Sequence, residues 1–317
     1  MKRALLALAL MSTFALPALP ATQVVVVSGL GGEAAFEKRF ETWSTDIAER
    51  AGTAAGSADN VTRLTGDAVR VEAIDAAMRT AASKLAAGDT FMLVLLGHGS
   101  FDGNDYRFNI PGPDVTGTQL GAWLDRIPAS IPQLIVNATS ASGGLAEKWA
   151  KPNRIVITAT KSFGERNATK FGEFWAEALG SEEADRDKDG NITALEAYDF
   201  ANRRVADTFK ADVAIATEHS QISGKEPARF VVARLGKSGQ FGSDAQLMAL
   251  RQQQSQLEEK LDGVRAQKAQ LGEDQYFAQL EPVLVDIARL GAQIDARVAS
   301  LGGDPNAQAG GNTDARQ

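Results

Sequence analysis

Apolar strand-like segments alternate with helical segments through residues 22–242 of this 317-residue chain. The segments with strand character are residues 23–28, 60–66, 90–97, 133–138, 154–160 and 226–235. Most are continuous apolar runs of the kind that parallel sheets bury on both faces. Residues 71–88 and 116–127 carry apolar residues at helical spacing. The alternation predicts an α/β fold with a mostly parallel sheet, helices on both faces, and ligands beyond the carboxyl ends of the strands.

The composition excludes several classes of function. The chain contains no cysteine, so neither a disulfide nor a cysteine nucleophile is available. Its formal net charge is −7, which disfavours a uniform nucleic-acid-binding surface, and we expect no nucleic-acid partner. Zinc ligation is disfavoured as well, because the chain has only two histidines, distant in sequence, and no thiol beside them.

The N-terminal residues have the pattern of a secretory signal peptide. Lys2 and Arg3 precede an apolar core from Ala4 to Leu16, and small residues follow up to Ala21. We predict a signal peptide over residues 1–21, cleaved after Ala21, and a secreted or periplasmic protein without a transmembrane segment after cleavage. The alternative is an uncleaved membrane anchor, but the apolar core is shorter than the roughly 20 residues of a comfortable span.

The C-terminal part has a different pattern. Between residues 243 and 301, leucine, isoleucine and valine recur at heptad spacing, with a turn predicted at Gly272. This spacing predicts an antiparallel helical hairpin or coiled coil with arms about 40 Å long. Pro282 should kink or start the second helix. The hairpin could pack on itself, on the α/β domain or on a second chain, so oligomerisation through these helices is one hypothesis. Residues 302–317 are polar and glycine-rich, and we expect disorder there.

Residues 185–196, DRDKDGNITALE, match the spacing of an EF-hand calcium loop. The residues expected to hold Ca²⁺ are Asp185, Asp187, Asp189, Asn191 through its carbonyl, Thr193 at the often water-linked ninth position, and Glu196. Helix-like segments flank the loop on both sides. The alternative is an acidic surface loop that only mimics the pattern. A single loop of this kind is expected to act as a structural clip rather than a sensor.

An imidazole follows one of the predicted strands. Residues 91–103, FMLVLLGHGSFDG, run from an apolar strand into Gly97, His98 and Gly99. The next strand ends in the small-residue turn ATSASG, residues 138–143. An apolar strand ending in His-Gly, followed by a strand ending in a Ser-Gly turn, resembles the legumain-like and caspase-like cysteine peptidases of clan CD.

The resemblance covers roughly residues 22–235. It implies a three-layer caspase-like fold and a peptide or protein ligand. It also implies His98 as the catalytic base and the Gly99 backbone as a donor to the oxyanion. Ser140 falls where the family has its cysteine, and Ser142 is an alternative nucleophile. Because a serine hydroxyl is much less acidic than a thiol, this replacement puts catalysis in question.

Four charged residues lie near the two motifs. In this family, the loop that follows the next strand helps to shape the specificity pocket, which places Glu165 and Arg166 near it. Arg166 would attract an anionic group there, although a surface salt bridge explains the pair equally well. Asp102 and Asp105 follow His98 and could orient its ring.

Three hypotheses compete for the function. The first is a pseudopeptidase that keeps the fold for binding or scaffolding. The second is a serine-dependent peptidase or hydrolase that uses His98 and Ser140. The third is an ordinary α/β domain whose glycines only make tight turns, and this hypothesis predicts that His98 lies far from Ser140.

Overall fold

The computed structural model describes residues 21–235, 244–268 and 270–301. Except for Ala21, the predicted signal peptide therefore lies outside the described residues. The predicted disordered tail at residues 302–317 lies outside them as well.

A six-stranded sheet in the order β10-β8-β7-β3-β1-β2 forms the centre of the described chain. Its strands are β1 (Thr22–Ser28), β2 (Val61–Leu64), β3 (Thr90–Leu96), β7 (Gln133–Asn137), β8 (Arg154–Thr158) and β10 (Gln221–Ser223). All pair in parallel except β10, which is an antiparallel edge strand. Ser28 pairs with Leu96, and Leu95 pairs with Asn137. The carboxyl ends of β1, β3 and β7 therefore lie side by side.

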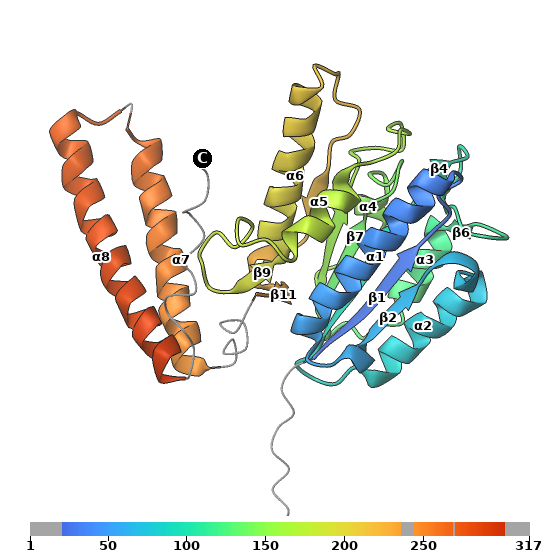
Figure 1. The fold of residues 1–317 in the computed structure, drawn as a ribbon, viewed down its shortest axis with the longest axis horizontal. Helices are drawn as coiled ribbons and strands as arrows, with labels where there is room; N and C mark the ends of the chain where they lie inside the picture. Colours follow the sequence, from blue (N-terminus) through green and yellow to red (C-terminus); the bar gives the residue numbers. More distant parts are fainter. Residues whose placement is uncertain (1–20, 236–243, 269, 302–317) are drawn as a thin grey trace, which may run out of the picture.

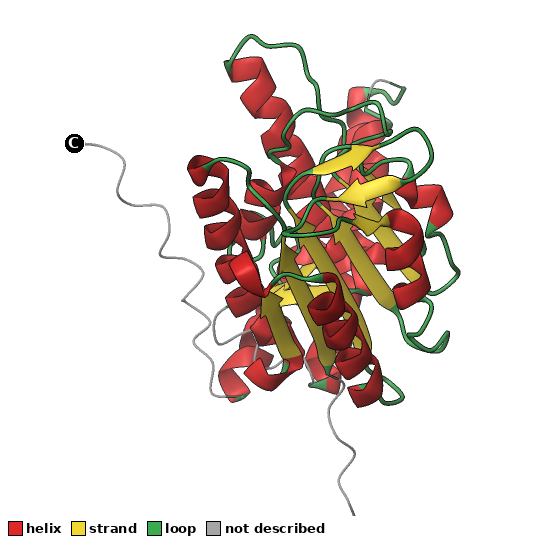
Figure 2. Ribbon diagram, turned by 90° about the vertical axis from the view of Figure 1, so that its right-hand side faces the viewer, coloured by secondary structure: helices red, strands yellow, loops and turns green. Residues whose placement is uncertain are grey.

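Helices cover both faces of this sheet (Figure 1). They are α1 (Ala34–Ala55), α2 (Val71–Lys84), α3 (Gly117–Leu124), α4 (Leu145–Lys148), α5 (Phe171–Ala178) and α6 (Ala194–Ala211). Trp43 of α1 and Phe200 of α6 belong to the core on one face, and Met78 of α2 and Trp123 of α3 to the core on the other. Figure 2 shows the sheet between these two layers. The predicted α/β fold class, three layers around a mostly parallel sheet, is confirmed.

Two smaller sheets accompany the central one. The first contains β4 (Gly99–Phe101), β5 (Tyr106–Phe108) and β6 (Val115–Thr116), and the second pairs β9 (Asn191–Thr193) with β11 (Val231–Arg234). Short 3-10 turns occur at Ala58–Asn60, Gly66–Ala68 and Pro227–Arg229. The strand predicted at residues 226–235 therefore begins later than expected, because Pro227 starts a turn. It also joins β9 instead of the central sheet, whose edge is β10.

The C-terminal residues form the predicted helical hairpin, α7 (Ala245–Ala266) and α8 (Glu273–Ser300). Asp244 caps α7 through the Leu247 N–H at 2.8 Å and pairs with Arg297 of α8 at 2.6 Å. Leu247, Leu290 and Ile294 lie in the apolar seam. Pro282 lies inside α8, so it does not start the helix. Among the described helices, none is both long and apolar enough to span a membrane.

Candidate functional site

His98 stands where β3 ends and β4 begins. Gly97 before it has φ +132°, a conformation that favours glycine. The Nε2 atom of His98 lies 3.1 Å from the carbonyl oxygen of Gly31. A carbonyl oxygen only accepts, so Nε2 carries the proton and Nδ1 is the acceptor of the neutral ring. The rings of Phe36 and Phe40 meet the imidazole edge-on, with centroids 5.1 and 5.4 Å away. The loop after β1, rather than an acidic residue, orients this histidine.

The structure brings the two predicted motifs into contact. A Cβ atom on Gly99 would lie 2.4 Å from the carbonyl oxygen of Ser140, so only glycine fits beside the serine turn. Asn109 N–H donates to the His98 carbonyl, and Gly99 is paired with Phe108. In this register Gly99 and Phe108 form a non-hydrogen-bonded pair. The N–H and C=O groups of Gly99 therefore point away from β5. We call the cluster of His98, Gly99 and Ser140 the strand-end site.

Ser140 is enclosed at this site. The residue is only 2% exposed. Among the described residues, its hydroxyl makes no hydrogen bond with His98 or with any other group. Ala141, next in the chain, has φ +53° and donates its N–H to the carbonyl of Glu165 at 2.7 Å. The serine turn is therefore tied to the loop that follows β8, which we call the 161–170 loop.

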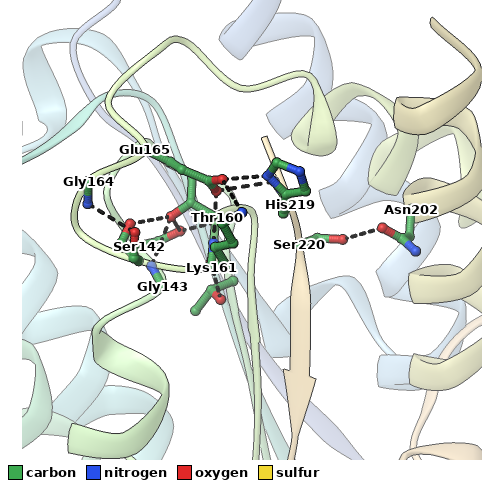
Figure 3. Close-up of polar contacts among 11 residues, drawn as sticks. Ser142, Gly143, Thr160, Lys161, Gly164, Glu165, Asn202, His219 and Ser220 are labelled. Carbon is green, nitrogen blue, oxygen red and sulfur yellow. Dashed lines mark hydrogen bonds and ion pairs between the residues drawn. The ribbon is translucent and has the colours of Figure 1, made fainter. Parts of the chain in front are cut away.

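Ser142, the alternative nucleophile, is fully buried. Its hydroxyl lies 3.2 Å from that of Thr160 and accepts the Thr160 N–H at 3.3 Å (Figure 3). Thr160 also accepts the Gly143 N–H at 2.9 Å. These bonds join the end of β8 to the serine turn, so Ser142 occupies a structural position.

A buried polar network that the sequence analysis missed lies beneath Ser140. Thr139 donates its hydroxyl to Asn137 at 2.7 Å, and the hydroxyls of Tyr106 and Thr139 lie 2.5 Å apart. Burial raises the pKa of Tyr106 to about 12, so the phenol remains protonated. The Nδ2 atom of Asn137 is buried and has no hydrogen-bond partner. The polar residues at the end of β7 were the available sequence signal for this network.

Neither acidic residue that follows His98 contacts it. Asp102 binds the guanidinium of Arg107 and the N–H groups of Asn104 and Asp105. Asp105 accepts the N–H groups of Tyr106 and Thr118. The backbone N–H bonds to Asp102 are the main reason that its pKa lies well below the ordinary value. Both carboxylates shape the β4–β5 connection, and the hypothesis that they orient His98 is wrong.

Glu165 and Arg166 have different surroundings. The Glu165 carboxylate accepts the Lys161 N–H at 2.9 Å and pairs with the ring of His219 (Figure 3). Burial opposes ionisation, but the Lys161 N–H and His219 outweigh it and lower the pKa of Glu165. Arg166 is exposed and has no hydrogen bond or ion pair within the described residues. The prediction that both shape a specificity pocket stays a prediction.

Two further contacts hold the 161–170 loop. Phe163 stacks on Phe101 of β4, with ring centroids 4.2 Å apart and planes 4° from parallel. At the end of the loop, Glu218 accepts the N–H groups of Lys170 and Phe171, both at 2.8 Å, and so caps α5. Burial raises the pKa of Glu218 to about 7. Because these contacts join segments distant in sequence, they keep the loop closed over the serine turn.

The acidic loop, residues 185–196, lies between α5 and the first turn of α6 and contains β9. One carboxylate oxygen each from Asp185, Asp187 and Asp189 lies within 4.8 Å of the others. Asp185 accepts the Gly190 N–H at 2.9 Å, and Gly190 has φ +77°. The tight turn expected at this glycine is therefore present.

The end of the acidic loop is anchored to the core and to α6. Glu196 accepts the Arg186 N–H at 3.0 Å and forms a capping box with Thr193 at the start of α6. Ile192 of β9 is fully buried in the main core. Asn191 and Thr193 belong to the same short strand, which pairs with β11. The residues at both ends of the loop are thus held in place by the fold.

The carboxylates of the acidic loop disfavour each other's charge. Burial raises the pKa values of Asp185 and Asp187, and the charges of Asp189 and Glu196 raise both further. Burial also raises the pKa of Glu196. A cation among these oxygens would stabilise their ionised forms.

Comparisons with known proteins complete the description. The sequence matches no protein-family model and no curated protein. Protein GSU0716 from Geobacter sulfurreducens is a similar solved structure, with a TM-score of 0.44 and 16% identity over 68% of this chain and 98% of that chain. Caspase-1 from Spodoptera frugiperda has a TM-score of 0.45 and 14% identity over 65% of this chain and 86% of that chain. Similarity at this level carries no information on activity.

Proposed function

We propose that this chain is an exported homologue of the legumain-like and caspase-like peptidases that is catalytically silent. It binds a peptide or protein as a scaffold that calcium stabilises. The observation that carries the proposal is the closed serine turn: Ser140 is 2% exposed, and its hydroxyl makes no hydrogen bond to His98 in the described chain.

The chemistry of the strand-end site supports a silent role. A serine nucleophile needs a base that accepts its proton and a third group that holds the base. The Gly31 carbonyl holds His98, but it offers no charge to stabilise an imidazolium. A thiol tolerates such a site better because it ionises near neutral pH. An alcohol at the same position has no comparable route to the alkoxide.

A serine-reactive fluorophosphonate probe tests this proposal on the full chain. We expect no labelling of the wild type. Labelling that disappears in Ser140→Ala and persists in the matched control Ser142→Ala would overturn the silent role and establish a serine hydrolase. Peptidase activity gained in Ser140→Cys would support the family resemblance, because the same frame would then act with the family's nucleophile.

The serine-dependent hydrolase is the second candidate. The contact between Gly99 and the Ser140 turn favours it, because base and nucleophile then come from adjoining turns. The protonated Nε2 of His98 also leaves Nδ1 as the acceptor. This mechanism requires the 161–170 loop to move away from the serine turn before substrate can enter.

Calcium binding by the acidic loop is the second part of the proposal. The residues that would hold Ca²⁺ are Asp185, Asp187, Asp189, Asn191 through its carbonyl, Thr193 through water, and Glu196. Their oxygen-only chemistry and the clustering of three carboxylates within 4.8 Å support this assignment. The pairing of β9 with β11 anchors Asn191 and Thr193 in the fold, which suits a structural clip.

Calorimetry tests the calcium site. A lone loop in an exported protein should bind with a dissociation constant of about 10⁻⁴ to 10⁻³ M. If the dissociation constant is about 10⁻⁴ M, a calcium concentration a hundred times that value stabilises the fold by about 2.7 kcal/mol. Asp187→Asn should abolish heat and stabilisation, whereas Asp207→Asn, exposed on α6, should change neither. Absence of both effects in the wild type would contradict the site.

The helical hairpin is the proposed partner surface. Phe277, Leu284 and Val285 of α8 remain exposed and line one shallow surface pocket, whereas Leu290 and Ile294 farther along α8 lie in the seam with α7. A contiguous apolar face of this kind favours a protein partner or a second copy. Deletion of residues 243–317 should change the oligomeric state or partner binding, measured by light scattering and co-purification. If neither changes, the hairpin has another role.

Export is the part of the proposal that rests on sequence pattern alone. The basic and apolar residues before Ala21 support it. Protein recovered from the cell envelope or medium should begin at Thr22 by N-terminal sequencing. Protein that retains Met1 and stays in the cytoplasmic fraction would contradict export.

A further inference from the structure

A cavity of about 380 Å³ opens at the amino ends of the central strands. Thr22 at the start of β1, Thr90 at the start of β3 and Asn153 just before β8 line it. The strand-end site follows the carboxyl ends of the same strands. The cavity is therefore separated from that site by the length of the sheet, and a ligand in it would not contact His98 or Ser140.

The charge of this cavity is opposite to that of the chain. Lys225, Arg229 and Arg234 line it together with one carboxylate, Glu226. Arg229 pairs with Glu226 at 3.1 Å, which accounts for one cation and the carboxylate. Within the described residues, Lys225 and Arg234 form no ion pair. Two positive charges therefore remain uncompensated in a protein whose formal net charge is −7.

Arg234 is the cation of this cavity that the fold holds in place. Its Nε atom is buried and has no hydrogen-bond partner. The backbone N–H of the same residue donates to the Thr53 hydroxyl at 2.7 Å, which fixes the start of the side chain. Leaving a buried donor unpaired is unfavourable, and more so when the group is charged. Because Arg234 also lines the cavity, its guanidinium can donate charge-assisted hydrogen bonds to a carboxylate or phosphate oxygen there.

The remaining wall of the cavity is apolar. Ala54, Pro132, Ile155 and Phe230 line it, and Phe230 is buried. The volume falls in the range of small-molecule sites, which combine an apolar lining with a few placed polar groups. Inorganic anions would leave this wall without contacts. We propose that the cavity binds a small organic anion, with its carboxylate or phosphate on Arg234 and Lys225 and its apolar tail against Phe230.

Isothermal titration of the full chain tests this site with four probes: hexanoate, hexyl phosphate, inorganic phosphate and 1-hexanol. At least one of the two tailed anions should bind once per chain. Inorganic phosphate and hexanol, which lack the tail or the charge, should bind about tenfold more weakly or worse. The comparison of hexanoate with hexyl phosphate shows which headgroup the site prefers.

Variants locate the binding. Lys225→Gln and Arg234→Gln should each weaken the preferred tailed anion about tenfold or more, because each removes a charged hydrogen bond. Lys260→Gln, the same change of charge on α7, should leave it unaltered. If Arg234→Gln does not fold, Lys225→Gln decides, since Lys225 is exposed. The proposal is overturned if neither tailed anion binds, if phosphate or hexanol binds equally well, or if the cavity variants bind as the wild type does.

Discussion

Replacing Glu218 by glutamine should change how the stability of the fold depends on pH. The Glu218 side chain is 5% exposed and lies between the 161–170 loop and α5. Burial raises its pKa from 4.5 to about 7, and the charge of Glu165 adds to the rise. The N–H groups of Lys170 and Phe171 oppose it but do not reverse it. In the folded chain, this carboxyl therefore holds its proton to a higher pH than in the unfolded chain.

The sign and size of the effect follow from linkage. Between pH 4.5 and about 7, the folded state binds more protons at this group than the unfolded state does, so the free energy of unfolding falls as pH rises. The stabilising contribution is complete below pH 4.5 and is lost above about pH 7. At about 1.4 kcal/mol for each pH unit, the loss amounts to roughly 3 kcal/mol. Glutamine cannot ionise, so Glu218→Gln lacks this loss.

Urea denaturation across this pH range measures the effect. The stability of Glu218→Gln relative to the wild type should rise by roughly 3 kcal/mol from the acid to the neutral end. Glu33→Gln is the matched control, because Glu33 is exposed and its side chain makes no cap hydrogen bond. Parallel pH profiles for Glu218→Gln and the wild type would refute the reasoning.

Three further changes test the packing of the serine turn and of the helical hairpin. Gly99→Ala should destabilise the fold by about 1–3 kcal/mol in urea, because its methyl group would lie 2.4 Å from the Ser140 carbonyl. Gly263→Ala, in the open interior of α7, should instead stabilise the hairpin by about 0.5–1 kcal/mol, measured by thermal denaturation. Thr160→Val should cost about 1–3 kcal/mol in urea, because it leaves the buried Gly143 N–H without its acceptor. Stability indistinguishable from that of the wild type would contradict each.

Much of the central sheet could be predicted from the sequence because its strands are buried on both faces. β1, β7 and β8 are buried along their whole length, and the middle of each is a continuous apolar run of the kind that such burial favours. β10 contains only three residues, of which Gln221 is exposed, and it left no such run. The segment at 226–235 is apolar because β11 packs on β9 and the core, not because it belongs to the central sheet.

The positions of His98 and Ser140 could be anticipated, but their environment could not. Adjacent parallel strands bring their carboxyl ends together, so two motifs that follow β3 and β7 must lie close. The partner of His98 is the carbonyl of Gly31, a backbone atom 67 residues away that leaves no signature in composition or spacing. The closure over Ser140 depends on Glu165 and His219, which are 54 residues apart. Such contacts follow from the assembled fold.

The closed loop separates two reasons for the proposed inactivity, one chemical and one steric, that the missing cysteine alone would not distinguish. One reason is chemical, since an alcohol replaces a thiol. The other is access, since the Ala141 N–H bond to Glu165 and the stacking of Phe163 on Phe101 hold the loop over the serine turn. Ser140→Cys changes only the chemistry, and Phe163→Ala loosens only the cover. Activity in the single cysteine variant would identify chemistry as the barrier, whereas activity that appears only when both changes are combined would identify access. If the protein is a scaffold that kept its fold for binding, we expect activity only when Ser140→Cys and Phe163→Ala are combined.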